Sequence, residues 1–398
     1  GASASAAPPP AAARAPPRRS APPDWTATLP WRVALRPALS LGGSAAPLTE
    51  QFDGTWAARR LRDGRILAGD RSNWRVLIFG PDGRPQGQFG REGRGPGEFD
   101  DLIGIFELHG DTLAIPMHTR GLQFFDREGK YLTHRYGPTP DSPGRPPAIV
   151  APLRDGSWLA MTRTPPTQPR TPGTIRTDTA TIVRLGAGDG SGRPLLELPI
   201  RTYRVDEKFG QVSMRFAPFA WVETVGDGFC ATWNATYLIT CHNPDGTTRR
   251  VIRRSLTGKP PTDALIARAV RSLTEMPMEA GAAPNAAFQE RRRLHAEAMP
   301  NAKVLPAIAQ LLGDPDGNLW VRYYGADDAA PKVRDPMNLP MPEEPSRWAV
   351  HDPQGRWLGD VTLPTGFRVL QIDRDGVLGL AIDADDVQLV RWYRLIKP

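Results

Sequence analysis

The histidines are the residues of this chain best suited to metal or proton chemistry. The 398-residue sequence contains six of them: His109, His118, His134, His242, His295 and His351. No pair has the His-x-x-x-His or a similar spacing that binds a metal ion from one segment. They would meet only where a fold brings distant segments together, so we expect most of them to be surface or strand-capping residues.

Three other patterns resemble reactive sites without completing them. The glycine-rich stretch 93–97 lacks the following helix and the Lys-Ser/Thr pair of a phosphate loop. The Asp-x-Asp-Gly stretches at 314–317 and 373–376 stop short of a calcium loop, and we interpret both as turns. No Gly-x-Ser-x-Gly elbow of a serine hydrolase occurs. We therefore predict a non-enzymatic protein without catalytic, metal-binding or cofactor-binding residues.

Turns that contain Asp-Gly or Gly-Asp recur along the chain from about residue 50, each followed by short apolar strands. Six such units have turns at 63–64, 110–111, 155–156, 226–228, 316–317 and 375–376. Asp-Gly supplies the positive φ angles of tight hairpin turns. Each small sheet has an apolar face that only a neighbouring sheet can cover, so six units predict a closed ring. The expected fold is an all-β, six-bladed β-propeller.

The last unit ends almost at the C-terminus, so the two ends of the chain are expected to share a blade. We expect a strand at 31–35 to complete the sheet that 392–395 belongs to.

The predicted domains are an extended Pro/Ala-rich tail over 1–24 and the propeller over 25–398. A propeller hydrolase or lactonase with a channel metal, or a propeller that senses a small molecule or carbohydrate, remains an alternative to a scaffold.

Insertions are expected where the spacing of the units lengthens. The stretches 161–180 and 323–345 are predicted to be loops in the third and fifth blades. The stretch 260–312 contains helical spacing at 263–273 and 286–298, with Thr262 or Asp263 as the first N-cap. It predicts a small helical insertion between blades.

A glycine-rich connector after the first unit is the most specific local pattern. Its sequence G-x-x-G-x-G-P-G-E-F contributes Gly90, Gly93, Gly95, Pro96, Gly97, Glu98 and Phe99. We expect the glycines to let the chain cross between blades, Glu98 to bind backbone amides, and Phe99 to fill the gap between blades. The pattern resembles the connector of NHL-type and related six-bladed β-propellers, closely over 60–130 and more weakly afterwards.

The Arg-rich and Pro-rich composition, together with this connector, further resembles the exported propellers of gemmatimonad bacteria. Some of these are similar in kind to membrane-extrinsic subunits of the gemmatimonad reaction-centre–light-harvesting photosystem. The resemblance implies a scaffold that docks, outside the cytoplasm, on a larger membrane-associated assembly of proteins.

The two cysteines, Cys230 and Cys241, lie on either side of a predicted hairpin that turns near 234–235. Such a hairpin brings the sulfur atoms close to bridging distance. A cross-strand disulfide and two separately buried thiols are both compatible with this pattern. A disulfide would favour a periplasmic or other extracytoplasmic location.

The net charge of +7 comes from 50 basic residues, of which 44 are arginine. A basic surface suits an acidic protein partner or an anionic membrane surface, although an ordinary solvated surface is the alternative. Arginine is scattered without a basic helix, so a nucleic-acid partner is not expected. No run of 18 apolar residues occurs. The candidate interface residues in or beside the tail are Arg14, Arg18, Arg19, Trp25 and Trp31.

Overall fold

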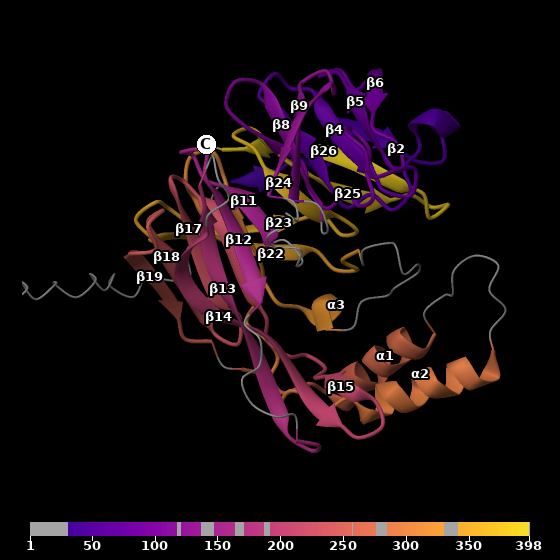
Figure 1. Ribbon diagram of the computed structural model, residues 1–398, viewed down its shortest axis with the longest axis vertical. Helices are drawn as coiled ribbons and strands as arrows, with labels where there is room; N and C mark the ends of the chain where they lie inside the picture. Colours follow the sequence, from indigo (N-terminus) through magenta and orange to yellow (C-terminus); the bar gives the residue numbers. More distant parts are fainter. Residues whose placement is uncertain are drawn as a thin grey trace, which may run out of the picture.

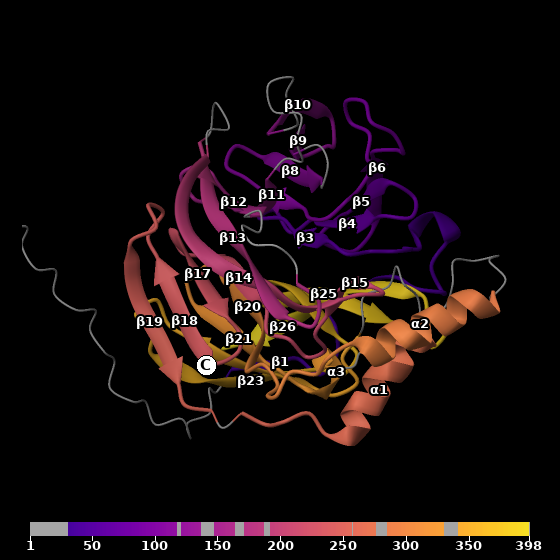
Figure 2. The same cartoon turned by 60° about the horizontal axis from the view of Figure 1, so that its bottom comes forward.

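The computed structural model describes residues 31–117, 121–136, 147–163, 171–186, 192–256, 258–275, 285–329 and 341–397. Their strands form six antiparallel sheets, here called blades and numbered from the first complete sheet, which are arranged in a ring (Figures 1 and 2). The expectation of an all-β fold with six blades is confirmed.

The first three blades follow one another along the chain. Blade one contains β3 (Ala58–Arg60), β4 (Ile66–Asp70), β5 (Arg75–Phe79) and β6 (Pro85–Phe89). Blade two contains β7 (Phe106–Glu107), β8 (Thr112–Met117), β9 (Gly121–Asp126) and β10 (Tyr131–Arg135). Blade three has five strands: β11 (Ala148–Pro152), β12 (Trp158–Arg163), β13 (Ile175–Leu185), β14 (Gly192–Asp206) and β15 (Gly210–Ser213).

The last three blades include the one that closes the ring. Blade four contains β16 (Ala220–Val225), β17 (Gly228–Trp233), β18 (Tyr237–His242) and β19 (Thr248–Arg254). Blade five contains β20 (Ile308–Gly313), β21 (Leu319–Tyr323), β22 (Ser346–His351) and β23 (Trp357–Leu363). Blade six contains β24 (Arg368–Ile372), β25 (Gly376–Ile382) and β26 (Gln388–Ile396).

Both ends of the described chain contribute to blade six, as the sequence predicted. Strand β1 (Arg32–Val33) pairs antiparallel with the end of β26, so that Arg32 lies opposite Ile396. Strand β2 (Leu39–Gly42) pairs with the beginning of β26. The short 3₁₀ helix η1 (Leu48–Glu50) then leads to blade one. β1 and β2 therefore form the outer strand of blade six, and this strand closes the ring.

The links between strands divide between two faces of the ring. Because neighbouring strands are consecutive and antiparallel in blades one to five, the strand ends joined by their first and third links lie at one end of the blade, as does the first link of blade six, and these links hold the Asp-Gly turns. We call this end the turn face. The second links and the crossings between blades lie at the opposite end, which we call the insertion face.

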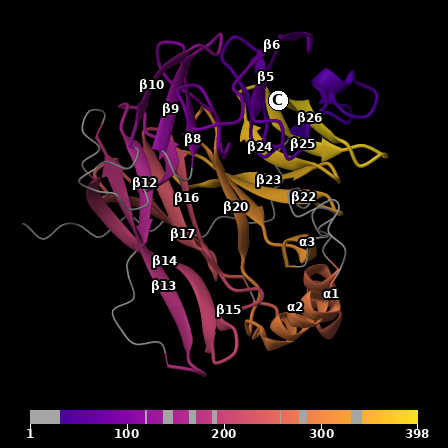
Figure 3. The ribbon, with the colours of Figure 1, turned by 45° about the vertical axis from the view of Figure 1, so that its right-hand side comes forward.

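Strands β13, β14 and β15 of blade three extend toward the insertion face, and we call them the ribbon. All the described helices longer than one 3₁₀ turn lie on this face, beside the end of the ribbon (Figures 1 and 3). Helices α1 (Asp263–Thr274) and α2 (Ala286–Ala298) fall between β19 and β20, which confirms the predicted helical insertion. The third helix, α3 (Ala326–Ala329), follows β21. Among the described residues, no helix is long and apolar enough to cross a bilayer.

The prediction of a loop over 161–180 is wrong at both of its ends. Strand β12 continues to Arg163, and β13 begins at Ile175 and pairs with β14 along its whole length. Strand β14, which the repeat pattern did not predict, is the longest strand of the fold. These strands extend beyond the buried part of the blade, and their polar, β-branched residues such as Thr177 and Thr179 favour a solvated ribbon. Of the second predicted loop, 330–340 lies outside the described residues, and α3 occupies part of the remainder.

The core lies between neighbouring blades. The cluster between blades one and two includes Phe89, Phe99 and Phe125, and that between blades five and six includes Trp320 and Trp348. Four tryptophans of the strands are buried, namely Trp158, Trp320, Trp348 and Trp392. The burial of large apolar side chains between sheets supplies the main stabilisation of such a ring.

Candidate functional site

The connector between blades one and two is held together by Glu98. One carboxylate oxygen accepts a hydrogen bond from the backbone N–H of Gly95 at 2.7 Å, and the other accepts one from Arg91 Nε at 2.9 Å. These hydrogen bonds lower the pKa of Glu98. A Cβ atom at Gly93 would lie 2.2 Å from the same carboxylate, which explains why this position is glycine. The structure thus places Glu98 as the anchor that the sequence suggested.

Phe99 lies in the gap between the same two blades and is fully buried. Its ring centroid is 5.8 Å from that of Phe125 and 6.3 Å from that of Phe89. Gly90 lets the chain pass directly against this ring, because its φ is +91° and an added Cβ would lie 2.1 Å from Phe99. The connector therefore forms a structural joint between blades one and two.

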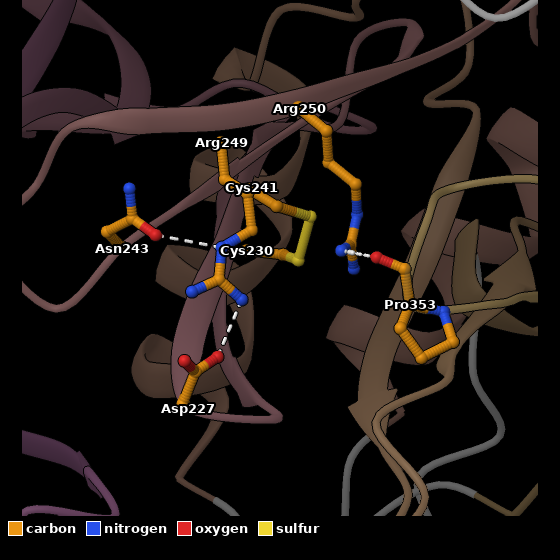
Figure 4. The surroundings of a disulfide bond; sticks show 7 residues. All are labelled: Asp227, Cys230, Cys241, Asn243, Arg249, Arg250 and Pro353. Carbon is orange, nitrogen blue, oxygen red and sulfur yellow. Dashed lines mark hydrogen bonds and ion pairs between the residues drawn. A yellow bond between two sulfur atoms is a disulfide. The ribbon is translucent and has the colours of Figure 1, made fainter.

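The two cysteines form a disulfide in blade four, which resolves the alternatives left by the sequence. Cys230 on β17 lies directly opposite Cys241 on β18, and both are buried. Next to it, Arg249 donates hydrogen bonds to Asn243 and Asp227, and Arg250 reaches the carbonyl of Pro353 in blade five (Figure 4). The bridge therefore reinforces a sheet that also contacts the next blade.

Two arginines in and beside the ribbon bind the C-terminus of α2 and so fix the helical insertion to the ribbon. Arg215 donates from its two terminal nitrogens to the carbonyls of Ala296 and Met299, each at 2.7 Å. Arg204 of β14 donates to the carbonyl of Ala298, also at 2.7 Å. Cations at this end of a helix satisfy its unpaired carbonyls and complement its dipole.

Helix α1 is fixed in turn to α2 and to α3. Its N-cap is Thr262, whose hydroxyl accepts a hydrogen bond from the N–H of Leu265 at 3.2 Å, one of the two predicted caps. Arg268 forms ion pairs with Asp327 of α3 at 3.2 Å and with Glu343 at 3.3 Å. The three helices and the ribbon end therefore form a connected platform, which we call the insertion platform.

The outer side of the insertion platform carries exposed apolar side chains among charged ones. Phe288 of α2 is 45% exposed, and Ile175 at the start of β13 is 58% exposed. Over residues 258–305 the sequence has seven Lys and Arg residues and five Asp and Glu residues. The insertion platform therefore presents a fixed surface with exposed apolar side chains and a small excess of basic residues.

The central channel contains charged side chains from the inner strands of four blades. The Arg59 guanidinium lies in the field of the Asp373, Glu107 and Glu223 carboxyls. Burial raises the pKa of Glu223 to about 8 and that of Asp373 to about 6. Glu223 also keeps partial solvent contact, since its side chain is only half-buried.

The histidines lie in separate surroundings. His109 and His134 are exposed, His242 and His295 are half-buried, and His118 lies outside the described residues. Among the residues that the structure describes, no three His, Cys, Asp or Glu side chains are grouped as metal ligands. His351 differs from the others, because it is fully buried and its Nε2 atom lies 2.8 Å from the Tyr237 hydroxyl.

His351 should make stability depend on pH. Burial lowers its pKa to about 4, so between about pH 6.5 and 4 the unfolded chain binds a proton that the folded chain does not. Stability is therefore lost as the pH falls through this window, by about 3 kcal/mol in total. Urea unfolding at pH 7.5 and pH 4.5 measures this loss. The difference between wild type and His351→Gln isolates it, because Asp373 titrates in both proteins; equal losses in the two proteins would contradict the prediction.

The Asp-x-Asp-Gly stretches are turns, as interpreted from the sequence. The Asp314 carboxylate accepts hydrogen bonds from the N–H groups of Asp316 and Asn318 and from the indole of Trp320. Asp373 accepts a hydrogen bond from Trp392 Nε1 at 3.2 Å. These carboxylate oxygens therefore accept hydrogen bonds from other groups of the fold.

Only one of the five candidate interface residues lies in the described part of the chain. Trp31 is half-buried on the turn face, where its ring lies 6.0 Å from that of Trp320 and the Lys397 ammonium lies 4.6 Å above it. Arg14, Arg18, Arg19 and Trp25 lie outside the described residues, as does the predicted tail over 1–24.

A cavity of about 200 Å³ lies at the insertion-face mouth of the channel, beside α3, and the sequence did not predict it. The inner strands of blades four, five and six contribute Trp221, Gln310 and Arg368 to its lining. Arg322 of β21 and Asp328 of α3 complete its polar side. No short sequence motif contains these residues, because they come together only when the ring closes. The one sequence signal for the cavity was a Trp or Arg near the end of an inner strand.

Comparison with solved structures finds related architectures. A DUF4221 family member from Bacteroides vulgatus has a TM-score of 0.53 at 10% identity, over 92% of this chain and 99% of that one. The fold is a six-bladed β-propeller. Looser likenesses are to a putative exported protein of Bacteroides fragilis (TM-score 0.47, 12% identity, 92% and 96% covered) and to a gluconolactonase of Xanthomonas campestris (0.43, 13%, 92% and 99%). No protein-family model and no curated protein matches the chain.

Proposed function

We propose that this propeller is a non-catalytic, extracytoplasmic scaffold subunit that docks through its insertion platform on a protein partner in a larger membrane-associated assembly. The observation that carries the proposal is the rigid attachment of α1, α2 and α3 to the ribbon end on one face. A surface that is already ordered loses little conformational entropy on binding. The buried disulfide supports an oxidising compartment.

The partner in this proposal presents an acidic or mixed surface with an apolar recess. Phe288 supplies an aromatic anchor beside the Arg292 guanidinium, which lies 5.8 Å from its ring centroid. The exposed ion pairs of Arg293 with Glu290 and Glu297 contribute little stability by themselves and leave the rim polar. Anionic lipid headgroups near the partner would add attraction for a chain of net charge +7.

The connector and the Arg-rich, Pro-rich composition support a narrower form of the proposal. In this form the assembly is a photosynthetic reaction-centre–light-harvesting complex, and the chain is an accessory subunit that stabilises it. Gentle solubilisation of source membranes, followed by gradient centrifugation, should place the chain in the pigmented band. Migration with an unpigmented complex removes the narrower form only, and migration as a free monomer contradicts the scaffold role.

Replacing Phe288 with Asp should weaken docking at least tenfold, because the change puts a charge at the apolar anchor of a basic platform that faces the partner. Membranes that contain the partner but have been depleted of this chain provide the docking site. The dissociation constant of the purified chain for these membranes measures the effect. Leu132→Asp is the matched control, because Leu132 is 50% exposed on β10, away from the insertion platform. Equal weakening by both variants, or by neither, would show that docking uses another face.

A further inference from the structure

We propose that the outer edge of blade six binds directly to an anionic lipid bilayer, with arginines on the headgroups and Leu35 inserted among the acyl chains beneath them. This contact deepens the scaffold role, and it rests on the membrane-associated location proposed above. Three features carry it: the loop between β1 and β2, the arginines around this loop, and the pairing of the nearest carboxylates.

The loop between β1 and β2 lifts Leu35 away from the sheet. The strand pairing on either side leaves residues 34–38 facing only residues 393–394 of β26. The N–H groups of Ala34 and Ala38 donate to carbonyls of β26 at 2.9 and 2.8 Å, so both ends of the loop are fixed. Leu35 lies between them and is 99% exposed, more than any other large apolar side chain of the described residues.

Three arginines surround this loop. Arg36 follows Leu35 directly and is exposed. Arg32 lies opposite Ile396, and Arg394 lies two positions before Ile396, so these three side chains share one face of the sheet. Both arginines are exposed, and Ile396 is 41% exposed. We call these five residues the blade-six edge, a surface with two apolar side chains among three cations.

The nearest carboxylates are paired with other cations. Asp316 pairs with Lys397 at 3.2 Å and with Arg374 at 3.4 Å. The backbone carbonyl of Asp375 accepts a hydrogen bond from β26, but its side chain pairs with Arg60 at 3.1 Å. Within the described part of the chain, the three arginines of the blade-six edge form no ion pair. They therefore leave a local excess of positive charge, which attracts an anionic surface.

A bilayer fits this arrangement better than an acidic protein surface does. A stable protein interface has a packed apolar core, whereas Leu35 projects alone from its loop. The lipid interface accepts such a side chain without a matching pocket, and long arginine side chains reach the headgroup phosphates beside it. Each basic residue near an anionic leaflet strengthens binding about fivefold, so three contribute on the order of a hundredfold.

Sedimentation of the full chain with protein-free vesicles tests the proposal. We expect vesicles that contain phosphatidylglycerol to bind at least tenfold more tightly than vesicles of phosphatidylcholine alone. This binding should weaken as salt is added, because salt screens exposed charges. Equal affinity for the two kinds of vesicle would overturn the proposal. Binding of soluble polyglutamate without binding of anionic vesicles would assign the surface to an acidic protein, which also overturns it.

The vesicles hold no protein, so this binding succeeds or fails independently of docking through the insertion platform. Leu35→Asp should weaken binding to anionic vesicles at least tenfold, because it replaces the inserted side chain with an anion. Leu132→Asp is the matched control, since Leu132 is an exposed leucine of blade two. Equal weakening by the two variants would contradict insertion of Leu35.

The contribution of the arginines needs a control for net charge. Replacing all three arginines of the blade-six edge with Gln should weaken binding to anionic vesicles at least tenfold. The control replaces three exposed arginines outside blade six and changes the net charge equally: Arg94, Arg193 and Arg253. Equal weakening by the two triple variants would show that only total charge matters, and would overturn the assignment to this edge.

A label at position 35 reports insertion directly. The two native cysteines form the disulfide, so the thiol of Leu35→Cys can be labelled selectively with a polarity-sensitive fluorophore. Its emission should shift to shorter wavelength when the protein binds anionic vesicles. Bound protein without this shift would show that the loop stays in water, and would contradict the proposal.

Discussion

Replacing Phe99 with Ala should lower the free energy of unfolding by about 3–5 kcal/mol, the usual cost of emptying a buried aromatic site. The effect should lie at the upper end, because the ring fills the gap between two blades and has no exposed surface. Gly90 and the rings of Phe89 and Phe125 surround the space and are already packed against other residues. The site therefore has little capacity to collapse.

Urea unfolding followed by tryptophan fluorescence measures this loss, with midpoint and slope compared between proteins. Phe288→Ala is the matched control, since the same change at an exposed phenylalanine should cost less than about 1 kcal/mol. A Phe99→Ala protein as stable as wild type would show that the connector can move away from the gap. It would also remove the structural reason for the glycine at position 90.

Removing the disulfide should destabilise the protein by about 3 kcal/mol. The bridge joins residues separated by 11 positions, and closing a loop of that length removes roughly this much free energy from the unfolded chain. The double variant Cys230→Ala, Cys241→Ala is preferable to serine, because both positions are buried among apolar residues. Its hydroxyl-free side chains avoid an unsatisfied polar group.

A reducing agent provides the internal control. It should lower the unfolding midpoint of the wild-type protein and leave that of the double alanine variant unchanged. Non-reducing electrophoresis before unfolding reports whether the thiols were oxidised at the start. If the reductant shifts both proteins equally, the bridge does not stabilise the fold.

The ring could be predicted from the sequence because its information is local. Each Asp-Gly pair specifies a hairpin turn through its backbone, and the turns at 63–64 and 316–317 lie where the pattern places them. The sharing of blade six by both ends of the chain could be predicted because the last unit ends almost at the C-terminus, which leaves a strand at 31–35 to complete its sheet. Hairpin geometry placed Cys230 and Cys241 close to bridging distance but left the disulfide and two separate thiols open, and the structure shows the disulfide.

The cavity and the long ribbon could not be predicted, for different reasons. Trp221, Arg322 and Arg368 belong to separate strands, and only the closure of the ring brings them together. The first part of β13 extends beyond the buried part of the blade and is mostly polar, so it lacks the alternation of apolar and polar side chains by which half-buried strands are recognised. Proline-rich flanks made the same stretch resemble a loop.

The pairing of β1 with β26 also has consequences for how the protein is made. Blade six needs residues from both ends of the chain, so it cannot assemble until β26, its last strand, has been translated. Contacts of such high sequence separation form late and slowly. After its synthesis, and until β1 and β2 pair with it, β26 presents an unpaired edge, where a second nascent chain could add in register. Export as an unfolded polypeptide, with assembly after delivery, would avoid the hazard.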